Sequence, residues 1–86
     1  MKNIHNVVSD VLDEIHANRR IRELVDYNQN ERIWNIRLRL GVSMFDVELY
    51  MDGENVSAGG VLRCVGFSDR FQTRFMDTLM NKLELT

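Results

Sequence analysis

The side chains that could carry chemistry are few in this chain, and they are scattered. His5 and His16 lie eleven positions apart in a segment with helical periodicity. About 16 Å of helix would separate them, so a single metal ion cannot bind both. Asp13 is three residues from His16, a spacing typical of a surface contact on a helix. Since no third polar group completes an acid–base pair, we expect no metal site and no cofactor.

The nucleophilic side chains also lack partners. Cys64 has no histidine near it and falls on the predicted core face of a strand, whereas a catalytic thiol needs an exposed, electropositive setting. The four serines fit no nucleophile motif. Gly59-Gly60 is not followed by the Lys-Ser/Thr pair of a phosphate-binding loop. We therefore expect a protein that is not an enzyme.

Arginine is the residue type that the composition favours. Nine of the eleven basic residues are Arg, which suits planar contacts with carboxylate or phosphate. Five of them occupy two short stretches that could grip a nucleic acid: Arg19, Arg20, Arg22, Arg70 and Arg74. Three others, Arg37, Arg39 and Arg63, share one predicted sheet face with Asp46 and Glu48. Such exposed ion pairs contribute about 0–1 kcal/mol each and mainly favour one strand register.

The composition sets the class of protein. The chain has 86 residues, a net charge of −2, 44% apolar residues, no proline and one cysteine. This length predicts one small α+β domain over residues 1–86, and the apolar content argues against disorder. A single cysteine excludes an internal disulfide framework and fits a reducing compartment. Because the apolar runs are short and the start lacks the apolar stretch of a signal peptide, we expect a cytoplasmic protein without membrane contact.

Two segments carry the periodicity of helices. Apolar residues recur at helical spacing from Ile4 to Ile15, which predicts a first helix that continues to about residue 25. The phase changes after Ile15, so residues 18–26 either follow a bend or pack against a second surface. In the second segment Ser68 is the predicted N-cap. The apolar residues that follow it recur four apart: Phe71, Phe75, Leu79 and Leu83.

Between these helices the period changes to two, as in half-buried strands. Residues 34–40 and 45–51 form one predicted hairpin, with a loop at Gly41–Met44 that sets Leu38 opposite Val47 and Arg39 opposite Asp46. This register places apolar pairs on one face and opposite charges on the other. A second turn at residues 52–55 sets Leu49 opposite Ala58 in a third strand.

The third strand combines small and large residues. Its predicted core face holds Ala58, Gly60, Leu62 and Cys64, and its outer face holds Val61, Val65 and Phe67. Gly59-Gly60 weakens a strand and predicts a bulge or a close helix approach at this point. The expected fold is therefore αβββα, a three-stranded antiparallel meander with two helices packed on one face.

This order of elements resembles the double-stranded-RNA-binding domain, in which a three-stranded sheet carries two helices on one face. The resemblance covers most of the chain. That family places lysines that grip phosphates at the start of its last helix, where this chain reads Ser68–Arg74 with two arginines and one aspartate. The family's Gly-Pro-x-His loop has no counterpart, since the chain lacks proline. The resemblance implies nucleic-acid binding, which we rank second because a net charge of −2 has the wrong sign for a phosphate-binding footprint.

The size, the acidity and the αβββα plan also resemble small phage-encoded inhibitors, including some anti-CRISPR proteins. No motif matches them residue by residue. This likeness implies an inhibitor or regulator that works in the host cytoplasm.

Our first hypothesis is accordingly a small module that binds another protein. Its candidate contact residues are Tyr50, Val61, Arg63 and Val65, which together form an amphipathic patch on the predicted outer sheet face. A homodimer through this face or through an unpaired sheet edge is a special case of this hypothesis. The alternative is an RNA- or DNA-binding domain that uses the two arginine clusters.

Overall fold

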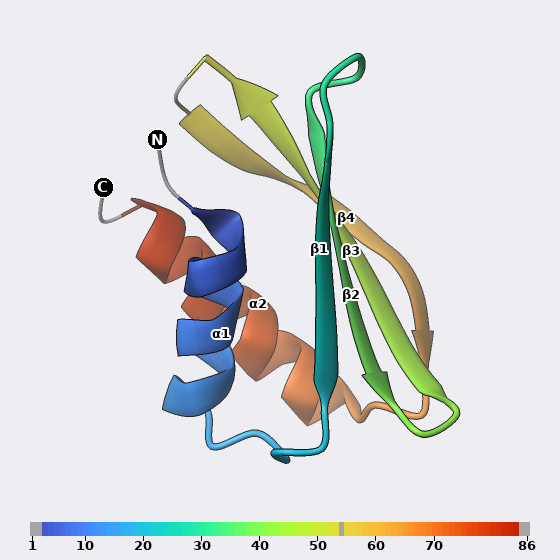
Figure 1. The fold of residues 1–86 in the computed structure, drawn as a ribbon. Coiled ribbons are helices and arrows are strands. Elements are labelled where there is room, and N and C mark those ends of the chain that lie inside the picture. The colour runs from blue at the N-terminus through green and yellow to red at the C-terminus, as the bar shows by residue number, and fades with distance from the viewer. Residues whose placement is uncertain (1–2, 54, 85–86) are drawn as a thin grey trace.

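The computed structural model describes residues 3–53 and 55–84, in which two helices frame four strands (Figure 1). The four strands form one antiparallel sheet in the order β1-β2-β3-β4. The chain therefore has the expected α+β class, but its order is αββββα and its sheet has four strands, not three. The elements are α1 (Ile4–Glu14), β1 (Arg22–Asn28), β2 (Ile33–Leu40), β3 (Ser43–Asp52), β4 (Asn55–Val65) and α2 (Asp69–Glu84).

The additional strand lies where the sequence suggested a longer first helix. Helix α1 ends at Glu14, and His16 adopts the left-handed conformation with φ 53°. The backbone N–H of Ala17 donates to the carbonyl of Leu12, and that of His16 donates to Asp13. This is the Schellman pattern of helix termination, with histidine in the place usually taken by glycine. The prediction that the first helix continues to about residue 25 was wrong, because the phase change after Ile15 marked the end of the helix.

In the first predicted hairpin the side chains lie on their predicted faces of the sheet, but their cross-strand partners differ from the prediction. Leu38 lies opposite Phe45, and Arg37 lies opposite Asp46, a shift of two residues from the predicted register. The cause is a two-residue turn, Gly41-Val42, in which Gly41 has a φ of 60° as in the tight turns of hairpins. Side chains alternate with a period of two, so a shift of two residues keeps every side chain on its predicted face.

The second hairpin begins as predicted, with Leu49 opposite Ala58, and then departs from the predicted register at two bulges. The first bulge lies at Gly59, within the Gly59-Gly60 pair at which the sequence predicted a bulge or a close helix approach. The second adds Leu62 between Val61, which pairs with Val47, and Arg63, which pairs with Asp46. The predicted faces of Gly60, Val61 and Leu62 were therefore wrong, since Gly60 pairs with Glu48 of the opposite face.

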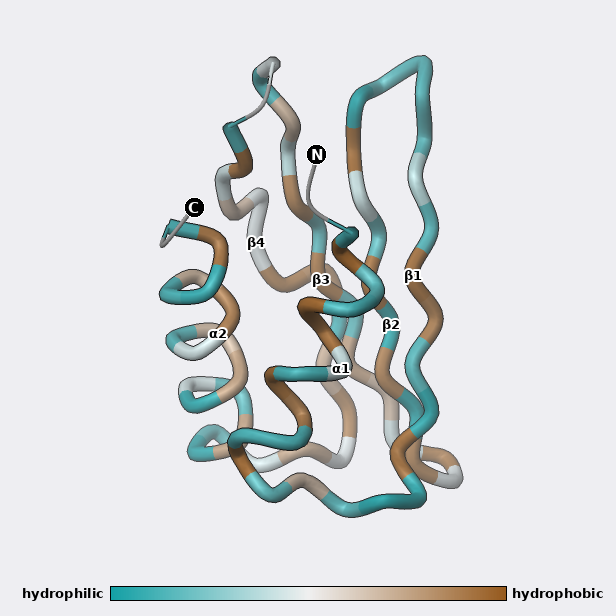
Figure 2. Tube along the Cα trace, turned by 60° about the vertical axis from the view of Figure 1, so that its left-hand side comes forward, coloured by the Kyte–Doolittle hydropathy of each residue, from teal (hydrophilic) through white to brown (hydrophobic). Residues whose placement is uncertain are grey.

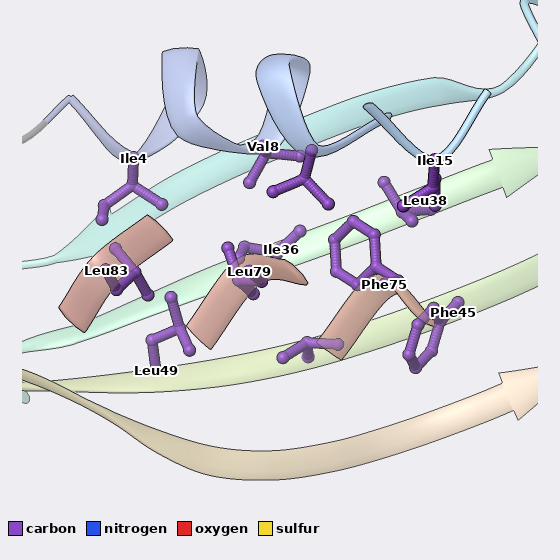
Figure 3. Packing of buried hydrophobic residues seen from close by; sticks show 12 residues of the cluster. Ile4, Val8, Ile15, Ile36, Leu38, Phe45, Leu49, Phe75, Leu79 and Leu83 are labelled. Atoms are coloured by element: carbon purple, nitrogen blue, oxygen red, sulfur yellow. The ribbon is translucent and has the colours of Figure 1, made fainter. Parts of the chain in front are cut away.

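Helices α1 and α2 run antiparallel to each other on the same face of the sheet, as expected (Figures 1 and 2). Twelve buried residues form the core between the two layers (Figure 3). They come from α1 and its C-cap residue Ile15, from β2 and β3, and from α2. Phe45 of β3 is fully buried, and its ring lies 5.7 Å from Phe75 and 6.3 Å from Phe71. Phe67, predicted on the outer face, lies beyond β4 and packs on Phe45 at 6.2 Å.

The start of α2 is fixed by the predicted cap. The backbone N–H of Phe71 donates to the Ser68 hydroxyl at 3.1 Å, which satisfies one of the free donors of the first turn. Cys64 is half-buried on the core side opposite Phe45, and its Sγ lies 3.7 Å from the carbonyl oxygen of Phe67. The short connection between β4 and α2 is thereby held against the core.

Truncating an apolar side chain should lower the stability of the protein much more on the helix-covered side of the sheet than on the opposite side. Leu79→Ala removes a fully buried side chain and should lower the free energy of unfolding by about 2–5 kcal/mol. Leu24→Ala removes a side chain that is 58% exposed and should change the free energy of unfolding by less than about 0.5 kcal/mol. Urea unfolding of dilute protein measures both values, and equal losses would contradict the one-sided core.

Candidate functional site

Because both helices cover the same side, the opposite side of the sheet is bare. We call it the outer face. Four of the large apolar side chains that are exposed in this structure lie on it, one from β1, one from β3 and two from β4: Leu24, Tyr50, Leu62 and Val65, which are 58%, 42%, 60% and 55% exposed. A bare face with several large apolar side chains is typical of a surface that binds another molecule.

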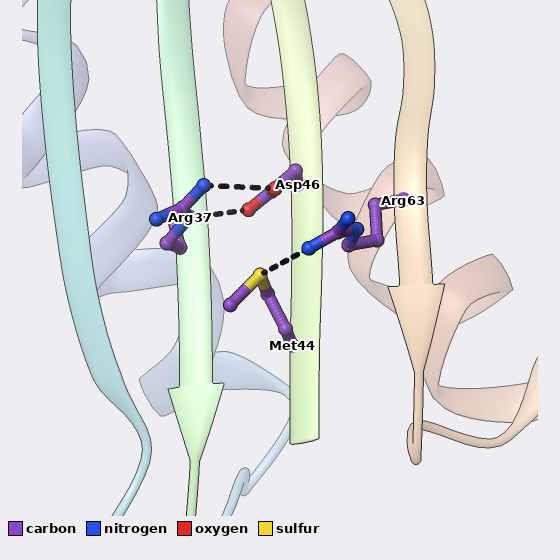
Figure 4. Close-up of polar contacts among 4 residues, drawn as sticks. All are labelled: Arg37, Met44, Asp46 and Arg63. Carbon is purple, nitrogen blue, oxygen red and sulfur yellow. Dashed lines mark hydrogen bonds and ion pairs between the residues drawn. The ribbon is translucent and has the colours of Figure 1, made fainter. Parts of the chain in front are cut away.

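An ion pair lies at the centre of the outer face (Figure 4). Arg37 makes a two-point contact with Asp46, with Nε 2.8 Å from Oδ1 and a terminal nitrogen 3.2 Å from Oδ2. The hydrogen bond and the charge of Asp46 raise the pKa of Arg37, so the guanidinium stays charged at any ordinary pH. A hollow of about 260 Å³ lies over this pair, and Leu24 and Leu62 are among its lining residues.

Tyr50 is positioned by the first bulge of β4. Its hydroxyl donates to a carboxylate oxygen of Glu48 at 3.0 Å. A Cβ atom at position 59 would lie 2.9 Å from the Tyr50 ring and 2.9 Å from the Glu48 carbonyl oxygen, so the ring packs closely over the Gly59 backbone. Glycine at position 59 is therefore required for this placement of the tyrosine.

The predicted protein-binding residues are only partly brought together. Tyr50, Arg63 and Val65 lie on the outer face, and the Arg63 guanidinium contacts the Met44 sulfur at 3.8 Å (Figure 4). Val61 is 44% exposed, but it pairs with Val47, whose side chain points into the core. It therefore lies on the other side of edge strand β4 and does not belong to this patch.

Two residues of the outer face were missed by the sequence analysis. Leu24 would have been found if residues 22–28 had been recognised as a strand, since exposed and half-buried positions alternate there. Leu62 could not have been found from alternation alone, because the second bulge turns it away from the predicted core face.

Charge is unevenly distributed along the outer face. Toward the β2–β3 turn, Arg22 pairs across the strands with Arg39. Arg63 lies in the central row, opposite Asp46 on the neighbouring strand. Toward the other end lie the acidic residues Asp26 and Glu48. Within residues 3–53 and 55–84, the outer-face arginines other than Arg37 form no ion pair. The outer face therefore has a basic half and an acidic half.

The residues predicted to bind nucleic acid come from one end of the molecule but face different ways. Arg70 and Arg74 line an open hollow of about 410 Å³ between the start of α2 and the loop after α1, together with His16. Arg19 and Arg20 belong to that same loop, at the lower end of Figure 1. Arg22 instead lies on the outer face opposite Arg39. The structure thus divides the predicted set between a loop–helix hollow and the sheet.

The histidines lie in separate environments. His5 Nε2 is 3.9 Å from a carboxylate oxygen of Glu23, on the helix-covered side of β1. His16 ends α1 and lines the arginine hollow. In the part of the chain that the structure describes, no three His, Cys, Asp or Glu side chains are grouped to hold a metal ion.

Comparisons of the chain with protein-family models, with curated proteins and with solved structures gave no match. Among the described residues, no helix is both long and apolar enough to cross a membrane. The αβββα order that carried the resemblance to the double-stranded-RNA-binding domain is not the order of this chain, which has a fourth strand in place of the second half of the predicted first helix. The evidence for a binding role of the outer face or of the arginine hollow therefore comes from their geometry.

The contact between Tyr50 and Glu48 can be tested by titration. The hydrogen bond to the Glu48 carboxylate, and then its charge, raise the pKa of Tyr50. The folded protein therefore keeps the phenolic proton to higher pH than the unfolded chain, and this contribution to stability is lost as the pH rises through the folded-state pKa. In a Tyr27→Phe background, tyrosinate absorbance should show a lower Tyr50 pKa in Glu48→Gln than with Glu48 intact. An unchanged pKa would contradict the contact.

Proposed function

We propose that this protein is a small non-enzymatic binding module, a regulator or inhibitor that acts by occupying a surface of a partner protein. The observation that carries this proposal is the bare outer face, in which exposed apolar side chains surround the Arg37–Asp46 pair. Interfaces commonly combine such an apolar centre with aromatic and arginine side chains. A solvent-facing sheet without a partner needs only polar residues, so leucines at positions 24 and 62 favour a binding role.

The size of the outer face suits a small interface. Four strands spaced by about 4.8 Å, each contributing about eight residues, give a patch of roughly 500 Å². Two such surfaces together bury about 1,000 Å², which is below the roughly 1,200–2,000 Å² of stable complexes and within the range of weak or transient contacts. The proposed complex is therefore a weak one that depends on a few side chains.

Capture of partners from a lysate tests this proposal, with nuclease present throughout. Tagged protein should retain a partner protein, and Leu62→Asp should lose it because a charge replaces the most exposed apolar side chain of the outer face. Asn81→Asp is the matched control, since it adds the same charge at an exposed position of α2, which packs on the other side of the sheet. Circular dichroism checks that both variants are folded. Equal capture by wild type and Leu62→Asp would contradict the proposal.

Nucleic-acid binding is the second candidate, and one observation favours it. Arg70 and Arg74 share a hollow with the loop that carries Arg19 and Arg20, so four of the five predicted arginines lie around one end of the fold. In the described residues none of these four forms an ion pair. The net charge of −2 weighs against a strong, purely electrostatic grip.

The salt dependence of binding separates the two candidates. If the arginine hollow binds duplex DNA, the logarithm of the affinity should fall by about 0.9 per decade of salt for each phosphate contacted. The double variant Arg70→Ala, Arg74→Ala should then reduce this slope by roughly two contacts. Fluorescence anisotropy with a labelled duplex at several salt concentrations measures the slope. A flat response would exclude this candidate.

A further inference from the structure

Among the described residues, the arginines at the basic end of the outer face form no ion pair. Arg22 and Arg39 are directly opposite each other on neighbouring strands, an arrangement that is unfavourable for like charges. Arg63 lies nearer the middle of the face, opposite Asp46 on the neighbouring strand, and its guanidinium contacts the Met44 sulfur at 3.8 Å. Among the described residues, Arg37 and Asp46 form the one ion pair of this face.

The carboxylates of the acidic half lie opposite uncharged residues on the neighbouring strands. Asp26 pairs across the strands with Asn35, and Glu48 pairs with Gly60, so neither carboxylate faces a basic residue on its neighbouring strand. The Glu48 carboxylate accepts a hydrogen bond from the Tyr50 hydroxyl. A partner that suits this face must therefore present acidic groups to the arginine half and basic groups to the acidic half.

A surface with exactly this distribution is present on every copy of the chain, so we propose that the outer face binds the outer face of a second copy in a two-fold dimer. This inference rests on the proposed role of the outer face in protein binding and names its occupant. A two-fold contact is self-complementary, because each residue that touches a second residue is touched in the same way from the other copy.

The charge pattern also selects the direction of the axis. An axis in the plane of the interface and perpendicular to the strands reverses the strand direction of the second copy. It therefore sets the basic half of each copy over the acidic half of the other. An axis parallel to the strands would instead place arginines over arginines, which is strongly unfavourable at a desolvated contact. The perpendicular axis passes near the Arg37–Asp46 pair, and Leu24 and Leu62 supply apolar contacts on either side of this pair, from the edge strands β1 and β4.

Charge exchange between two variants tests this arrangement. Arg22→Glu with Arg39→Glu gives both halves of the face a net negative charge, and Asp26→Lys with Glu48→Lys gives both halves a net positive charge. Sedimentation velocity should show concentration-dependent dimers for the wild type, and at least about tenfold weaker dimerisation for each variant alone. An equimolar mixture of the two variants should recover dimers, because acidic and basic faces then meet at both contacts. Arg19→Glu with Arg20→Glu is the control, since it makes the same charge change in the loop before β1 and should leave dimerisation unchanged.

Three results would overturn the inference: a wild-type chain that stays monomeric at all concentrations, variants that dimerise as well as wild type, or a mixture that stays monomeric. A monomeric wild type whose captured partner is lost in Leu62→Asp would show that the outer face binds a different protein. In that case the proposed function stands and the dimer does not. Dimers that persist in Leu62→Asp would instead place the contact elsewhere on the molecule.

Discussion

The packing of α2 against β3 is the contact on which the rest of the structure depends. The Phe45 ring meets Phe71 and Phe75 from the helix, and Phe67 closes the cluster from the connection that leads into α2. A chain of this length has only enough apolar residues for one such layer. Since α1 joins α2 on the same side, all of the deeply buried side chains lie between helices and sheet.

The outer face is a consequence of this one-sided core. An antiparallel sheet can leave one face in water, and it then normally carries polar side chains at alternate positions. Here the alternation is interrupted by Leu24 on edge strand β1 and by Leu62, which a bulge turns outward on edge strand β4. The bulges also blunt the β4 edge, which favours docking on the face of the sheet over extension of the sheet by another strand.

Much of this arrangement could be predicted from the sequence, and the failures have physical causes. The α+β class, the cap at Ser68 and the bulge next to Gly59 follow from periodicity and from residue chemistry. Strand β1 was missed because the phase change after Ile15 was interpreted within a continuing helix, and because histidine at position 16 is not the residue expected to end a helix. Leu62 was misplaced because alternation cannot detect an inserted residue. Of the four residues predicted to share one face, Tyr50, Arg63 and Val65 consequently do so and Val61 does not.

The central claim is that the bare face of the sheet is the surface through which this protein meets its partner, a second copy of itself. Amide chemical shifts of the isotope-labelled protein, followed over a concentration series, test it most directly. The account predicts that the shifts that change with concentration lie in the four strands, with the largest changes around Arg37, Asp46 and Leu62, while the exposed positions of α1 and α2 stay constant. Changes confined to the helices, or spectra that do not depend on concentration, would contradict it.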